Sequence, residues 1–321
     1  MRVLVTGAAG MIGRKLTARL LSERKIGDRP ITELDLQDVV PFDAPDGNGI
    51  KIATHVSDLA APGSARALAA RRPDVVFHLA GIVSGQAEAE FELGYHVNLD
   101  GTRALYEAIR EAGNAPRVVY TSSIAVYGGP FPDIIPDEFH TSPLSSYGAQ
   151  KVMGEALLQD YTRRGFLDGI GLRLPGITVR PGKPNKAASG FFSSIIREPL
   201  AGLPAVLPVP RSVVCTHASP RAAVGFLMHA ASLDSAAVGP HRNLPLPGAA
   251  VTVGDQIEAL ARVAGSDAVR LIREEHDEAI WAMVKNWPTR FEARRSRELG
   301  FKAEDSFDEI IRAYIEDDLN G

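Results

Sequence analysis

The residues best suited to chemistry in this chain are Tyr147 and Lys151, which stand four positions apart. Residues at this spacing lie on the same face of a helix. A nearby ammonium stabilises phenolate and lowers the pKa of a tyrosine from about 10 towards neutral pH, where a general base is effective. The pair therefore predicts that Tyr147 removes a hydroxyl proton, although a surface tyrosine and lysine on one helical face have the same spacing.

Hydroxyl side chains precede this pair in the segment TSSIAVYG (121–128), directly after the apolar run 117–120. The carboxyl end of a strand in a parallel α/β sheet is where ligands bind. We expect Ser123 to orient a substrate oxygen and to stabilise the charge that develops on it. Ser122 is the alternative for this role.

A glycine-rich segment, TGAAGMIG (6–13), follows the apolar run 3–5 and opens a helical pattern. Gly7 suits a tight turn, Gly10 the close approach of a pyrophosphate, and Gly13 the packing of a helix against a strand. Free amides at the start of the helix, including those of Met11 and Ile12, favour an anion. This context predicts a dinucleotide site.

An acidic residue at the end of the second strand would accept the adenosine ribose hydroxyls. Asp38 and Asp35 are both candidates. We prefer Asp38 because it comes last in the strand, and we expect Asp35 to be a solvated charge at the strand end. Either carboxylate repels the 2′-phosphate of NADP and so favours NAD, although Arg14 and Lys15 lie nearby in the sequence.

Two further segments are expected to line the cofactor. After the third strand, Asp58 is placed to accept from the adenine amino group, with Leu59 beside it. The fourth strand ends in HLAG (78–81), where Leu79 and Ala80 are small or apolar enough for backbone to lie against a dinucleotide. We assign no chemistry to His78, since a lone histidine at a strand end is usually structural.

Short apolar runs alternate with longer amphipathic stretches through the first half, which predicts a doubly wound parallel sheet of the Rossmann type. The expected strands are 3–5, 34–36, 74–77, 117–120 and 170–174, and the expected helices are 11–21, 65–70, 101–112 and 145–163. Prolines become frequent after Leu174. We therefore expect an NAD-binding domain over 1–174, with 216–246 returning to it, and a smaller substrate-binding or cap region over 175–215 and 247–321.

The bulk composition points to an ordinary globular protein. The 321 residues carry a formal net charge of -4, which disfavours a nucleic-acid partner. A single cysteine, Cys215, rules out an internal disulfide framework, and no Cys/His spacing predicts a metal site. With neither a leader pattern nor a long apolar run, we expect a cytoplasmic protein without a membrane partner.

With these residues in place, the chain resembles the extended short-chain dehydrogenase/reductase superfamily, which includes sugar-nucleotide epimerases. The resemblance rests on TGAAGMIG, HLAG, NLDGT (98–102), SSIAVYG, the Tyr147 and Lys151 pair, and RLP (173–175). It implies an NAD-dependent oxidoreductase in which Ser123, Tyr147 and Lys151 are catalytic and Asn98 supports the site. It also implies cofactor contacts from Asn98, Ser122, Tyr147 and Lys151, and a homodimer formed through the helices 101–112 and 145–163.

A narrower likeness is to the D-erythronate dehydrogenase family, whose members are similar to uronate dehydrogenases. It is carried by GIVSG (81–85), RPGKPNKAASGFF (180–192), IIREPL (195–200), ASPR (218–221), VTVG (251–254) and WP (287–288). It implies oxidation of the C2 hydroxyl of D-erythronate to 2-dehydro-D-erythronate. Such a small anionic acid needs hydroxyl or amide donors and a cation, and Ser84, Ser123, Tyr147, Asn185 and Lys186 are the candidates, with Arg180 in reserve. Lys183 and Lys186 would equally suit a solvated loop.

Three alternatives remain open. A nucleotide-sugar epimerase or a uronate dehydrogenase would use the same motifs, whereas a 4,6-dehydratase would need an Asp-Glu pair where Ile124 and Ala125 stand. A protein that binds NAD only to sense its redox state has no need of Tyr147 and Lys151. Their presence favours an enzyme.

Overall fold

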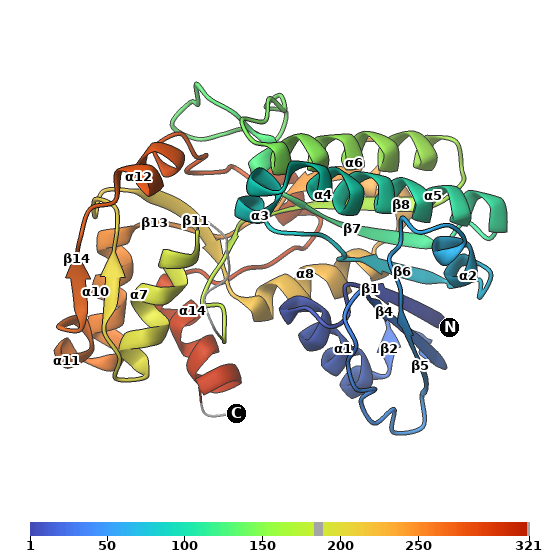
Figure 1. Cartoon of the computed structure of the whole chain (residues 1–321), viewed down its shortest axis with the longest axis horizontal. Coiled ribbons are helices and arrows are strands. Elements are labelled where there is room, and N and C mark those ends of the chain that lie inside the picture. Colours follow the sequence, from blue (N-terminus) through green and yellow to red (C-terminus); the bar gives the residue numbers. More distant parts are fainter. Residues whose placement is uncertain (183–188, 320–321) are drawn as a thin grey trace. The chain divides into compact units, whose positions relative to one another are not determined.

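The computed structural model describes residues 1–182 and 189–319. The chain forms two compact units, each built from several stretches of sequence (Figure 1). Unit 1 comprises Met1–Val126, Ser145–Arg173 and Val224–Leu244, and unit 2 comprises Tyr127–Leu144, Leu174–Ala223 and Pro245–Gly321. Among the described residues, no helix is both long enough and apolar enough to cross a membrane.

Unit 1 is built on a seven-stranded sheet with the order β12-β8-β7-β6-β1-β4-β5. The pairs β1·β4, β4·β5, β1·β6 and β6·β7 are all parallel. The strands are β1 (Arg2–Thr6), β4 (Glu33–Asp38), β5 (Lys51–Val56), β6 (Val75–His78), β7 (Arg117–Ser123), β8 (Asp168–Leu174) and β12 (Asn243–Pro245). The sequence order of strands reverses direction beside β1, which is the doubly wound arrangement that the alternating pattern predicted. The predicted fold class is confirmed.

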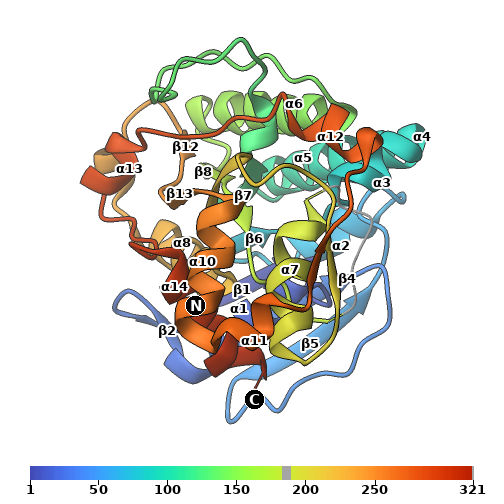
Figure 2. The same cartoon turned by 90° about the vertical axis from the view of Figure 1, so that its left-hand side faces the viewer.

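Helices cover both faces of this sheet, as parallel strands require. In Figures 1 and 2, α5 and α6 lie on one face while α1 and α8 lie on the other. The helical elements of unit 1 are α1 (Met11–Glu23), α2 (Ser64–Ala69), α3 (Ser84–Ala89), α4 (Phe91–Tyr95), the π-helix η1 (His96–Asp100), α5 (Gly101–Ala112), the 3-10 turn η2 (Ile124–Val126), α6 (Ser146–Arg163), most of α8 (Pro220–Ser232) and α9 (Ser235–Val238). A short hairpin, β2 (Lys25–Ile26) and β3 (Arg29–Pro30), follows α1.

The core beneath α5 and α6 explains why these segments are helical. Leu105, Tyr106 and Ile109 of α5 are buried at helical spacing against Val118 and Tyr120 of β7. The helix ends at Gly113, whose φ of 66° is left-handed and suits glycine. The β7 strand that carries the serines is thus fixed by packing on its α5 and α6 side.

Unit 2 contains a small sheet of order β13-β11-β9, formed by β13 (Ala249–Thr252), β11 (Val214–Ala218) and β9 (Gly176–Ile177). A separate pair joins β10 (Ala205–Leu207) to β14 (Ile272–Glu274). The helices are α7 (Gly190–Leu200), α10 (Val253–Ala264), α11 (Ser266–Val269), α12 (Glu278–Val284), α13 (Arg294–Glu298), α14 (Phe307–Tyr314) and the π-helix η3 (Ile315–Leu319). Phe192, Ile257, Phe307 and Ile310 belong to its own apolar core.

The segment 127–144 differs from the division expected from the sequence, which placed it in the first domain. It groups with unit 2 because its contacts are there: Ile135 forms a bridge with Phe291, and the Asp137 carboxylate accepts from the Arg295 amide at 2.7 Å. The chain therefore leaves unit 1 after Val126 and returns at Ser145, between the serine motif and Tyr147.

Candidate active site

The glycine-rich turn between β1 and α1 leaves no room for side chains. A Cβ on Gly7, whose φ is 73°, would lie 2.7 Å from the Ala80 amide nitrogen, and one on Gly13 would lie 2.2 Å from the Gly7 carbonyl oxygen. The start of α1 at Gly10 has no side-chain cap. Its first amides are therefore available to an anion. This cradle fits the pyrophosphate of a dinucleotide.

Asp38 lies at the end of β4, directly beside this turn. Its Oδ2 accepts from the Ala9 amide at 2.9 Å and its Oδ1 from the Val39 amide at 2.7 Å. Oδ1 also accepts from the Val40 amide at 3.3 Å. A carboxylate oxygen has two acceptor sites, so Oδ2 keeps a lone pair for a ribose hydroxyl. The role of Asp38 as the ribose ligand stays a prediction.

Asp35 is buried rather than solvated, which corrects the expectation from the sequence. Its carboxylate lies 2.6 Å from Arg71 Nε and 3.0 Å from His55 Nε2, and its side chain is 2% exposed. The partners come from β5 and from the turn after α2, positions that the spacing of the β4 residues could not reveal. Asp35 is therefore an internal ion-pair residue of the sheet.

Asp58 is held by a histidine that the sequence did not single out. Its Oδ2 lies 2.6 Å from His96 Nε2 and its Oδ1 accepts from the Ala60 amide at 2.9 Å. Burial raises the pKa of Asp58, but these hydrogen bonds outweigh burial and hold the pKa below its ordinary value. The hydrogen bond to Asp58 raises the pKa of His96. Leu59 is buried, so only its backbone is positioned to meet a ligand.

His78 lies in a buried chain of hydrogen bonds that links Thr6, at the end of β1, to Thr102 of α5. Thr102 Oγ1 donates its single proton to the Asn98 carbonyl oxygen at 2.7 Å, so it accepts from His78 Nε2 at 2.9 Å. His78 Nδ1 must then accept from Thr6 Oγ1 at 2.8 Å. Burial and the nearby Lys151 lower the pKa of His78 to about 3. His78 is a neutral histidine with both ring nitrogens in use, beside Leu79 and Ala80.

Helix α6 presents Tyr147 and Lys151 together because a cap fixes its first turn. Ser145 is the N-cap, and its Oγ accepts from the Gly148 amide at 3.1 Å. Lys151 Nζ lies 5.6 Å from the centroid of the Tyr147 ring and donates to the Thr121 carbonyl oxygen at 2.8 Å. Burial lowers the pKa of Lys151 to about 8, while Glu155 acts in the opposite direction. Tyr147 itself is partly exposed.

The two serines at the end of β7 differ in their partners. Ser122 is buried and donates its hydroxyl proton to Glu155 Oε1 at 2.5 Å. Ser123 is partly exposed, and its Oγ accepts from the Ala125 amide at 3.1 Å. Because a hydroxyl has one proton, Ser122 has already used the one that a substrate oxygen would need. The geometry favours Ser123 for that role.

Asn98 connects the cofactor side of the sheet to α6. Its Oδ1 accepts from the Ile82 amide at 2.9 Å and its Nδ2 donates to Gln150 Oε1 at 2.7 Å, next to Lys151. A Cβ on Gly81 would lie 2.9 Å from Asn98 Oδ1 and 3.6 Å from Lys151 Nζ. Asn98 and Lys151 therefore border the same narrow space beside the end of β6. Gln150 was not identified from the sequence, because it carries no motif of its own.

The NAD dependent epimerase/dehydratase family matches residues 3–213 of this chain. The chain belongs to that family. It is 48% identical to a D-erythronate dehydrogenase of Cupriavidus necator over 99% of this chain and 98% of that protein. It is 40% identical to a D-erythronate dehydrogenase of Haemophilus influenzae over 99% of this chain and 100% of that protein. The crystal structure of a nucleoside-diphosphate-sugar epimerase from Agrobacterium tumefaciens is 58% identical, with a TM-score of 0.97 over 100% of this chain and 95% of that one.

Membership of the NAD dependent epimerase/dehydratase family confirms the predicted superfamily and its NAD cofactor. Of the residues expected to bind only the substrate, the structure describes Ser84. Ser84 is the first residue of α3 and is partly buried. Asn185 and Lys186, together with Lys183, lie outside the described residues.

Arg180, the further candidate for binding the substrate carboxylate, lies in unit 2. Its Nε donates to the Ile177 carbonyl oxygen at 2.9 Å and its Nη2 to Ser189 Oγ at 2.5 Å. Arg197 Nη1 in turn donates to the Arg180 carbonyl oxygen at 2.7 Å. These bonds connect β9 to the start of α7, which gives Arg180 a structural role within unit 2.

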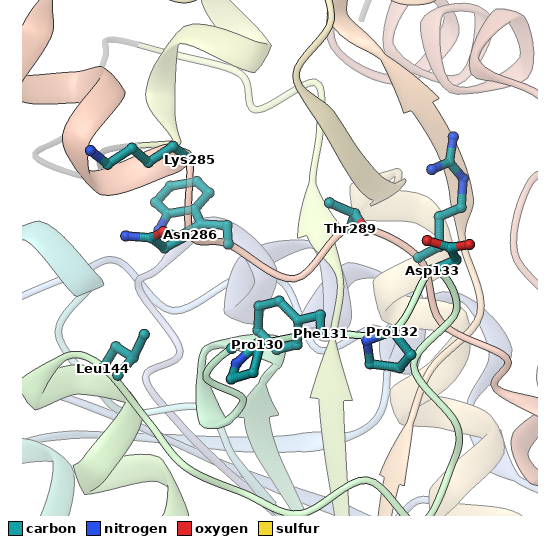
Figure 3. A pocket seen from close by; sticks show the side chains of 11 residues that line it. Pro130, Phe131, Pro132, Asp133, Leu144, Lys285, Asn286 and Thr289 are labelled. Atoms are coloured by element: carbon teal, nitrogen blue, oxygen red, sulfur yellow. The ribbon is translucent and has the colours of Figure 1, made fainter.

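A cavity of about 560 Å³ lies within unit 2, between the segment 127–144 and the chain after α12. Figure 3 shows Lys285 and Asn286 on one side, Asp133 on the other, and Pro130 and Phe131 between them. Its lining residues are Gly129, Pro130, Phe131, Pro132, Asp133, Leu144, Lys285, Asn286, Trp287, Thr289 and Arg290. Sequence reasoning noted only the Trp287-Pro288 pair here, because the other lining residues carry no motif.

Proposed function

We propose that this protein oxidises the C2 hydroxyl of D-erythronate to 2-dehydro-D-erythronate with NAD as the hydride acceptor. The observation that carries the substrate is the likeness, over almost the full length of both chains, to two relatives named D-erythronate dehydrogenase. The chemistry rests on unit 1, where Tyr147 and Lys151 share a helical face beside the end of β7.

NAD would be held by the Gly7 to Gly13 cradle, by Asp38 at the ribose and by Asp58 at the adenine. When bound, its nicotinamide supplies the acceptor for the hydride that leaves C2. Tyr147 Oη takes the proton from the C2 hydroxyl as the C–H bond breaks, so that the alcohol loses one proton and one hydride. The Lys151 ammonium stabilises the phenolate form of Tyr147.

Ser123 would donate its hydroxyl proton to the reacting oxygen and keep it oriented towards Tyr147. Asn98 holds Gln150, and with it the turn of α6 that carries Lys151. We assign the substrate carboxylate and the remaining hydroxyls to Ser84, Asn185 and Lys186. A charge-assisted bond from a lysine is both strong and orienting for a carboxylate.

An epimerase acting on nucleotide sugars is the second candidate, since the 58% identical crystal structure bears that description. An epimerase returns its hydride to the substrate within each cycle and releases no NADH. A dehydrogenase releases one NADH for each acid that it oxidises. The two functions therefore differ in a single measurable product.

The test is an NADH assay over four- to six-carbon aldonates, uronates and nucleotide sugars. We expect D-erythronate to give the highest kcat/KM and nucleotide sugars to give no NADH. Tyr147→Phe should reduce kcat by about 10³-fold and leave the Kd for NAD within about twofold, because a general base contributes roughly 10² to 10⁴-fold. Conversion of a nucleotide sugar to its epimer without NADH release would refute the proposal, and a higher kcat/KM for a uronate would transfer it to that acid.

We also propose that the enzyme is a cytoplasmic homodimer formed through α5 and α6. The superfamily resemblance supports the dimer. The single cysteine, Cys215, supports the cytoplasmic location. Sedimentation equilibrium checks the assembly, and a charge-reversal variant of an exposed α5 residue, Arg103→Glu, should weaken it. A monomer at micromolar concentration would contradict the dimer.

A further inference from the structure

Glu155 is a buried carboxylate one helical turn beyond Lys151. It belongs to α6 and is 3% exposed. Its Oε1 accepts from Ser122 Oγ at 2.5 Å and from Arg173 Nε at 2.9 Å, and its Oε2 accepts from Arg173 Nη2 at 2.7 Å. None of the sequence motifs that indicated the catalytic set includes this residue.

The bonds from α6 to the end of β7 come from two successive turns of the helix. Lys151 Nζ donates to the carbonyl oxygen of Thr121, and Glu155 accepts from the hydroxyl of Ser122. The next residue along β7 is Ser123. Arg173, on the neighbouring strand β8, holds Glu155 from the other side. The position of Ser123 relative to Tyr147 is therefore fixed through Glu155.

Glu155 also differs in charge from the other groups around Lys151. Tyr147 is on the same helix, Tyr120 of β7 has its ring centroid 4.9 Å from Lys151 Nζ, and His78 of β6 is neutral. Burial raises the pKa of Tyr120 well above its ordinary value, so this phenol is neutral too. Among the described residues that interact with Lys151, Glu155 supplies the negative charge.

Stability alone does not account for this arrangement. Burying an ion pair costs several kcal/mol per ion in desolvation, and well-packed apolar residues of similar volume often serve as well or better. The Glu155 carboxylate places a negative charge on the helical face of Lys151 and accepts from Ser122, and apolar residues could do neither.

We propose that Glu155 is a positioning residue for the dehydrogenase reaction, which acts through Lys151 and Ser122 without touching substrate. It holds the serine-bearing end of β7 against α6, and it places one buried negative charge beside the ammonium that supports Tyr147. The role in catalysis rests on the proposed function, whereas the effect on Lys151 does not.

The test compares Glu155→Gln, which keeps the acceptor for Ser122 and removes the charge, with Ser122→Ala, which keeps the charge and removes the bond. We expect Glu155→Gln to move the alkaline limb of the kcat profile down by about one pH unit, because a close opposite charge shifts a pKa by roughly one to three. Ser122→Ala should lower kcat severalfold without moving the profile. Glu155→Gln should bind NAD with a Kd within about twofold of wild type.

A direct titration of Lys151 separates this proposal from the proposed function. The chain has eight lysines, so ¹³C-lysine labelling of the full-length protein gives few signals, and Lys151→Met assigns the relevant one. The double variant Glu155→Gln/Arg173→Met leaves no buried arginine unpaired and serves if the single variant does not fold. We expect Lys151 to titrate about one pH unit lower in Glu155→Gln, and to shift in the same direction by a smaller amount in the double variant, because the positive charge of Arg173 is lost together with the negative charge of Glu155. An unchanged titration would overturn the proposal, even if no sugar acid is oxidised by the wild type.

Discussion

Replacing Lys151 by methionine should abolish turnover and change how stability depends on pH. Burial lowers the pKa of Lys151 from 10.5 to about 8, and its side chain lies in the interior. A lowered lysine pKa means that the unfolded chain binds the proton more tightly than the folded protein does. The resulting penalty is therefore complete below about pH 8 and disappears as the pH rises through 10.5.

The magnitude follows from the difference between the two pKa values. About 1.4 kcal/mol per pH unit gives a penalty of ~3 kcal/mol at pH 7 and ~1 kcal/mol at pH 9.5. The wild type should therefore gain ~2 kcal/mol of unfolding free energy relative to Lys151→Met over that interval. Loss of the bond to the Thr121 carbonyl oxygen adds a constant offset, which the comparison between two pH values removes.

Urea unfolding of both proteins at pH 7, 8, 9 and 9.5 measures this difference. Far-UV circular dichroism is the suitable probe, because Trp281 and Trp287 both lie in unit 2 whereas Lys151 lies in unit 1. Making both proteins in a Tyr147→Phe background removes the phenol whose pKa Lys151 changes, and His78, with a pKa of about 3, does not titrate in this range. Titrating groups that do not interact with Lys151 are common to the two proteins and cancel. A difference that stays constant across this range would show that the pKa of Lys151 is not lowered in the folded protein.

Two further substitutions test the cofactor site and the packing of α6. Asp38→Asn removes the negative charge beside the glycine-rich turn but keeps a hydrogen-bond acceptor. It should weaken NAD binding about tenfold and improve the affinity for NADP relative to NAD, as measured by calorimetric titration. An unchanged preference for NAD over NADP would contradict the assigned role of Asp38. Gly154→Ala puts a Cβ 2.3 Å from Tyr120 Oη and should cost about 1 to 3 kcal/mol of unfolding free energy in urea. Gly225→Ala, in an exposed helical position with open space around it, is its control and should stabilise by up to about 1 kcal/mol.

The sequence was sufficient for the sheet and for the ends of its strands. Apolar runs that alternate with amphipathic helices admit few topologies, and parallel strands bring their carboxyl ends to one edge. That is why Asp38 could be preferred to Asp35, and why Ser123 could be associated with Tyr147 although the segment between them belongs to the other unit.

The features that were missed depend on pairs of residues distant in sequence. Glu155 looks like a solvated helix charge until Arg173 and Ser122 are seen to surround it. His96 has no visible role until it meets Asp58. A charged residue in an amphipathic pattern carries no mark of its partner, so spacing alone cannot separate a buried pair from a surface charge.

The carbon that loses the hydride can be identified by deuterium labelling of the substrate. D-erythronate deuterated at C2 should give NADH that carries one deuterium on its nicotinamide ring, with a normal isotope effect on kcat/KM where hydride transfer limits the rate. The same acid deuterated at C3 should give unlabelled NADH. Deuterium transferred from C3, or no NADH from either acid, would show that the enzyme does not oxidise the C2 hydroxyl of D-erythronate.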